Sequence, residues 1–129
     1  MANITDKVKT FEDACSVLGI NPEDFKITYP EKVNHHAKAL AAHTKLIIIA
    51  EALNEGWVPD WSNREWDKWF PWFDFNDSSS SSGRFSFYDS DDRYSYSNCG
   101  SRLCFKSEEL ADYAGKQFED LYREYYVID

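Results

Sequence analysis

The sequence predicts a single α+β domain with two N-terminal helices, an antiparallel meander of three to four strands, and a C-terminal helix packed on the sheet. Three observations predict it. Apolar residues repeat at helical spacing near both ends, they alternate at strand spacing between those ends, and no alternation of strands with helices suggests a parallel sheet. The 129 residues fit one domain that spans residues 1–129.

The first helix is predicted from its end signals. Thr10 followed by Asp13 has the pattern of a capping box, and apolar residues then repeat at helical spacing until Gly19. Asn21 followed by Pro22 at a first helical position predicts one further helical turn.

The second helix is predicted over residue 31 to about residue 54, with Gly56 as its stop signal. Its C-terminal part, residues 46–53, is apolar on more than one face and therefore needs cover on several sides. The tryptophan-rich segment that follows is the expected cover, so we expect Trp57 or Trp61 to anchor the end of this helix to the sheet.

The strands are predicted from alternating aromatic and polar residues. Pro71 cannot donate to a strand ladder, so its strand is expected to lie at an edge or to contain a bulge. The polar stretch NDSSSSSG is expected to be a mobile serine-rich hairpin loop over residues 76–83. The expected strands cover residues 68–76, 84–89, 93–97 and 102–106, with an acidic turn at residues 89–92.

The last helix is predicted to begin after Ser107 and to continue to about Tyr125. Ser107 is a favourable N-cap, and Glu108 and Glu109 suit the positive end of the helix dipole. Gly115 would allow this helix to approach the sheet closely.

Charge and cysteine content narrow the function classes. The net charge of −9 repels phosphate backbones, so direct nucleic-acid binding is disfavoured. The N-terminus lacks an apolar signal core, and the longest strongly apolar run, residues 46–50, is too short to cross a bilayer. Three cysteines suit a reducing compartment, so a cytoplasmic protein without membrane contact is expected.

Motifs for metal binding or catalysis are missing. His36 and His43 share a helix face but lie about 10.5 Å apart along the axis, too far for one metal ion. Cys99 and Cys104 have no second pair to complete a zinc site, and the acidic turn lacks the calcium-loop pattern. We therefore predict no catalytic residues, no metal ligands and no cofactor.

The aromatic content is the most unusual feature. All five tryptophans lie within residues 57–72, and protein interfaces are enriched in Trp, Tyr and Arg. A segment this rich in aromatic rings is difficult to bury completely. The expected binding residues are Trp57, Asp60, Trp61, Lys68, Trp72 and Arg102.

Two segments, WVPDWSNREWDKWFPWF at 57–73 and GSRLCFKSEELADYAGKQFEDLY at 100–122, carry a family resemblance. They resemble uncharacterised small proteins encoded by phages and prophages of Bacteroidetes, which have similar W-x-P-D-W, P-W-F and S-R-L-C-F-K-S motifs. The resemblance implies a phage or mobile-element origin, a place in the cytoplasm of an infected or lysogenic bacterium, and no established activity.

The sequence therefore favours a non-enzymatic binding protein that engages a host or phage protein, or a small ligand, through an aromatic-rich surface. Three alternatives stay open. One is a small hydrolase or transferase that uses Asp60 and another carboxylate. The others are a carbohydrate-binding module, whose rings would stack on sugars, and an acidic DNA mimic with an anti-defence role.

Overall fold

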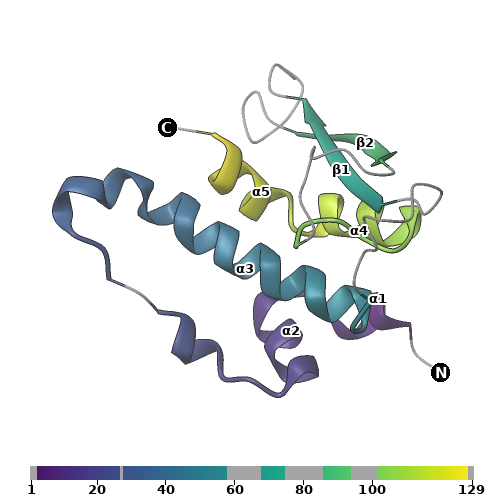
Figure 1. Cartoon of the computed structure of the whole chain (residues 1–129), viewed down its shortest axis with the longest axis horizontal. Coiled ribbons are helices and arrows are strands. Elements are labelled where there is room, and N and C mark those ends of the chain that lie inside the picture. Colours follow the sequence, from purple (N-terminus) through teal and green to yellow (C-terminus); the bar gives the residue numbers. More distant parts are fainter. Residues whose placement is uncertain (1–2, 27, 58–67, 75–85, 94–101, 128–129) are drawn as a thin grey trace.

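The computed structural model describes residues 3–26, 28–57, 68–74, 86–93 and 102–127 (Figure 1). The α-helices are α1 (Ile4–Lys7), α2 (Phe11–Leu18), α3 (Ala37–Asn54), α4 (Glu108–Gln117) and α5 (Glu119–Tyr126). Two 3-10 helices, η1 (Pro22–Phe25) and η2 (Glu31–His36), precede α3. The strands are β1 (Lys68–Asp74) and β2 (Ser86–Arg93), which pair antiparallel.

The predicted α+β class with a three- to four-stranded meander is wrong. The described residues are mostly helical, with five α-helices, and strand pairing within them is limited to β1 with β2 and one isolated bridge. β2 continues through residues 89–92, where the sequence predicts a turn between two strands. Its main chain pairs with β1 along this acidic stretch, so the predicted turn is part of a strand. The register of the two strands shifts between Trp72 and Phe73, one residue after Pro71. This irregularity agrees with the bulge predicted near the proline.

The local end signals of α2 and η1 are confirmed. The Thr10 hydroxyl accepts a hydrogen bond from the Asp13 amide at 3.1 Å, and Gly19 ends α2 in the left-handed region with φ of 72°. The Asn21 side chain accepts from the Glu23 amide at 3.0 Å, which begins the single turn of η1.

The long helix starts later than predicted. Residues 31–36 form η2, and the α-helix begins only at Ala37, where no side chain caps its first turn. It ends at Asn54, after which Glu55 and Gly56 both adopt left-handed conformations. Figure 1 shows α3 in the middle of the molecule, with α2 on one side and α5 on the other.

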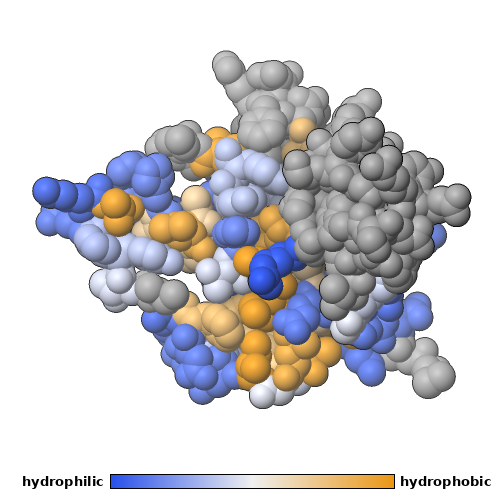
Figure 2. Space-filling view, in the orientation of Figure 1, coloured by the Kyte–Doolittle hydropathy of each residue, from blue (hydrophilic) through white to orange (hydrophobic). Residues whose placement is uncertain are grey.

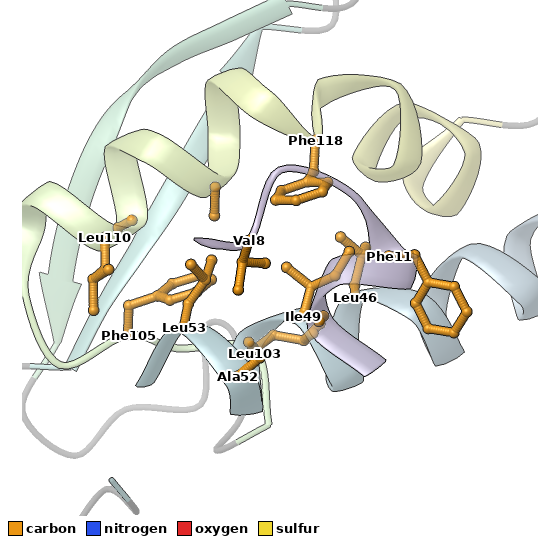
Figure 3. Close-up of a cluster of buried hydrophobic side chains, with 14 of the residues drawn as sticks. Val8, Phe11, Leu46, Ile49, Ala52, Leu53, Leu103, Phe105, Leu110 and Phe118 are labelled. Atoms are coloured by element: carbon orange, nitrogen blue, oxygen red, sulfur yellow. The ribbon is translucent and has the colours of Figure 1, made fainter. Parts of the chain in front are cut away.

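The hydrophobic core surrounds the second half of α3. Phe105, Leu46, Ile49, Leu53 and Val8 are all less than 2% exposed. Figure 3 shows side chains from α2, α3 and α4, and from the segments that precede α2 and α4, converging on this interior. Within the described ranges, the cover for α3 therefore comes from both ends of the chain, and Trp57 at the end of α3 is half-buried.

The single C-terminal helix of the prediction is two helices. The Ser107 hydroxyl caps α4 by accepting from the Leu110 amide at 3.3 Å, as predicted. The helix then breaks at the buried Phe118, whose φ of −113° and ψ of 27° are not helical. This break lets α4 pack on β1 and β2 while α5 packs on α3.

Gly115 permits the close approach that the sequence predicts. A Cβ atom added there would lie 2.8 Å from Cβ of Pro71 and would overlap the ring of Phe87. Only glycine therefore fits between α4 and the two strands.

Several predictions fall outside the described residues: the loop at 76–83, the strand at 94–97, and the positions of Asp60, Trp61 and Cys99. None of the helices in the described ranges is both long and apolar enough to cross a membrane.

Candidate functional site

A buried asparagine joins the end of α3 to the segment that leads into α4. Asn54 is 5% exposed, its side-chain amide donates to the Cys104 carbonyl at 2.9 Å, and its side-chain oxygen accepts from the Lys106 amide at 3.0 Å. Phe105, between these two residues, exchanges main-chain hydrogen bonds with Trp69 of β1 at 3.0 and 2.7 Å. Because the main-chain polar groups of successive residues in an extended segment point to opposite sides, Asn54 binds one side of this segment and β1 binds the other.

This junction joins the segments of the chain that carry four of the six predicted binding residues. Trp57 follows α3 directly, and its amide donates to the Asn54 carbonyl at 3.0 Å. Lys68 and Trp72 belong to the β1 backbone, and the exposed Arg102 precedes the segment that Asn54 and Trp69 hold. The structure thus brings together the three stretches of chain that carry these four residues. Asp60 and Trp61 lie outside the described residues.

The histidines and cysteines in the described part of the chain do not form a metal site. The rings of His35 and His36 lie 3.8 Å apart on the exposed η2. Cys15 and Cys104 are fully buried, and burial raises the pKa of the Cys15 thiol. Among the described residues, no three His, Cys, Asp or Glu side chains are grouped so that they could hold a metal ion.

A cluster of aromatic rings connects the core to the surface. We call it the aromatic cluster and define it as His43, Phe73, Phe87, Tyr122, Tyr125 and Tyr126. The ring of Phe73 lies 4.8 Å from Tyr122, 5.9 Å from Tyr126 and 6.1 Å from Phe87. The rings of Tyr125 and Tyr126 lie 5.0 Å apart. Residues from α3, α5, β1 and β2 therefore meet in one aromatic arrangement.

The exposed fraction of the rings increases from one end of the aromatic cluster to the other. Tyr122 is 2% exposed, whereas Tyr126, one turn later on α5, is 42% exposed. His43 of α3 stacks on Tyr125 with ring centroids 4.5 Å apart and an angle of 10° between the ring planes. The exposed end of the cluster is thus held by rings on both α3 and α5.

Polar contacts hold the strands against the cluster. The Glu119 carboxylate, at the start of α5, accepts from the Phe87 amide of β2 at 2.7 Å. The Lys116 ammonium lies 5.5 Å from the centroid of the Phe87 ring. The position of β2 is therefore fixed from both α4 and α5.

Sequence reasoning missed this cluster as a candidate site. It named Tyr125 as the approximate end of the last helix and considered His43 as a possible metal ligand. The concentration of tyrosine at residues 122–126 was a usable signal, because Tyr is enriched at interfaces. Asn54 gave a weaker one, as a polar residue at the end of an apolar helix.

No protein-family model, no curated protein and no solved structure matches the chain.

Proposed function

We propose that this chain is a non-enzymatic binding protein that engages another protein through the exposed end of the aromatic cluster. The observation that carries the proposal is Tyr126, which is 42% exposed although it lies in ring contact with Phe73, Tyr122 and Tyr125. Tyrosine offers a large amphipathic contact area with few rotatable bonds.

The packing of the cluster supports this function. Binding orders mobile side chains at a cost of about 0.5–1.5 kcal/mol for each one that is immobilised. Rings already held by Phe73 and by the His43 stack have less freedom to lose. A partner that contacts Tyr126 would therefore meet a surface that is arranged before binding.

The family resemblance suggests where the partner would be found. A phage or prophage origin would place the chain in the cytoplasm of an infected or lysogenic bacterium, and its partner would then be a host or phage protein.

A photocrosslinking experiment tests the proposal. A benzophenone amino acid would replace Tyr126 in one variant and Val17 of α2 in another, because both side chains are 42% exposed. Irradiation of the purified variants, with and without Bacteroidetes lysate, should give a discrete adduct from position 126 that excess unlabelled protein competes away. The same adducts from both positions, or none from position 126, would contradict the proposal.

A further inference from the structure

The first half of α3 is less completely covered than the second half, although Ala42 within it is buried. Leu46, Ile49 and Leu53 are buried in the core, whereas Leu40 is 41% exposed and Ala41 is also exposed. An apolar residue every three or four positions on one helix side normally packs on another element. Figure 1 shows α3 and η2 extending beyond the end of α5, and Figure 2 shows hydrophobic residues between hydrophilic ones at that end.

This uncovered end carries positive charge on an acidic protein. We call residues 31–45 the basic arm: they include three lysines, one glutamate and all three histidines of a chain whose net charge is −9. The neighbouring α5 has the opposite character, with Glu119, Asp120 and Glu124 against Arg123. A surface complementary to the arm in charge is therefore present on the chain itself.

The basic arm and α5 lie next to each other. His43 of the arm stacks on Tyr125 of α5 at 4.5 Å. Leu40 lies one turn before His43 on the same side of α3, because residues three apart share a helix face. Leu40 and Tyr126 are therefore exposed apolar groups close to the boundary between a basic region and an acidic one.

We infer that this face binds a second copy of the chain in a two-fold dimer. In such a dimer the basic arm of each copy lies along α5 of the other, because a two-fold axis makes both contacts equivalent. Leu40 and Tyr126 are then covered at the centre, and the lysines of the arm face the carboxylates of the partner's α5. The inference rests on the proposed function, since it names the partner that the aromatic surface takes.

Charge reversal tests the pairing directly. One variant carries Lys32→Glu and Lys38→Glu, which makes the arm acidic, and the other carries Asp120→Lys and Glu124→Lys, which makes α5 basic. Sedimentation velocity at up to ~200 μM protein and ~50 mM salt should show a dimer for the original chain that weakens at ~500 mM salt. Each variant alone should dimerise at least about tenfold more weakly, because its arm and α5 then repel across the interface.

Mixing the two variants supplies the decisive measurement. The acidic arm of one meets the basic α5 of the other, and the second contact joins the acidic α5 to the unaltered basic arm, so the mixture should form a heterodimer. Leu40→Glu should abolish the dimer, whereas Val17→Glu, at a position of matching exposure, should leave it unchanged. Circular dichroism would establish that every variant is folded.

Any other result overturns the inference that the chain forms this dimer. It fails if the original chain is monomeric throughout this range, if both charge variants dimerise normally, or if their mixture stays monomeric. A monomeric chain that still crosslinks from position 126 to a different lysate protein would overturn the dimer and leave the proposed function standing. A chain that neither dimerises nor crosslinks would overturn both.

Discussion

Asn54 joins α3 to the segment before α4, and its replacement by alanine should destabilise the fold. The change removes the hydrogen bonds to the Cys104 carbonyl at 2.9 Å and to the Lys106 amide at 3.0 Å. Each bond contributes about 0.5–1.5 kcal/mol, and a buried polar group left without its partner costs about 1–3 kcal/mol. Cys104 is 0% exposed, so water cannot easily replace the lost donor there.

The expected loss of unfolding free energy is about 2–3 kcal/mol. Alanine has a better helix propensity than asparagine, which offsets up to about 0.7 kcal/mol of the hydrogen-bond loss. The net effect is still a large part of a stability of about 5–15 kcal/mol. Urea unfolding followed by tryptophan fluorescence would measure it, and hydrogen exchange should show that the Lys106 amide loses protection.

Two further variants sharpen this test. Glu51→Ala alters an exposed residue one turn earlier in α3 and should change stability by less than about 0.5 kcal/mol. Asn54→Asp keeps an acceptor for the Lys106 amide but removes the donor to Cys104, so it should destabilise while that amide stays protected. A loss below about 1 kcal/mol for Asn54→Ala would refute the reasoning, because the two bonds would then contribute little.

Three other perturbations have defined outcomes. Gly115→Ala should lower the thermal midpoint and cost about 1–3 kcal/mol, since the new methyl would lie 2.8 Å from Cβ of Pro71; a stabilised variant would contradict the packing. Tyr113→Phe removes a 2.6 Å hydrogen bond to the Val8 carbonyl and should cost about 1 kcal/mol at neutral pH. Burial, with smaller contributions from two nearby carboxylates, raises the pKa of Tyr113 above 10.0, so this stabilisation is present below pH 10 and lost as the pH rises through the folded-state pKa. Stability curves of both proteins should therefore converge above pH 10, and a constant difference would count against this. Burial raises the pKa of Cys15, so iodoacetamide at pH 8 should modify it in urea but not in the native protein, as mass spectrometry of the peptides would show.

The features that sequence alone determined are those made by neighbouring residues. The Thr10 cap, the left-handed Gly19 and the Ser107 cap each involve contacts within five positions of the chain. Such signals depend on the local backbone and a single side chain, so they can be recognised without knowing the fold. The apolar second half of α3 was recognised for a similar reason, because its composition alone demands cover.

Tertiary structure decided the features that depend on distant residues. Alternation at residues 84–97 predicts strands, but it cannot show that the acidic stretch within β2 pairs with β1 instead of turning. The helical pattern from Ser107 continues past Phe118 in the sequence. In the structure the helix is interrupted at Phe118, because α4 and α5 pack on different elements.

Some features of the candidate site could likewise be predicted from the sequence, and others depend on the tertiary structure. The tryptophan-rich segment was visible in the sequence, but the contact between His43 and Tyr125 joins residues more than eighty positions apart, and Asn54 reaches Cys104 across fifty. No local pattern encodes which distant groups a fold brings within hydrogen-bonding or stacking distance. That choice is made by the burial of the α3 surface, which draws both ends of the chain onto one helix.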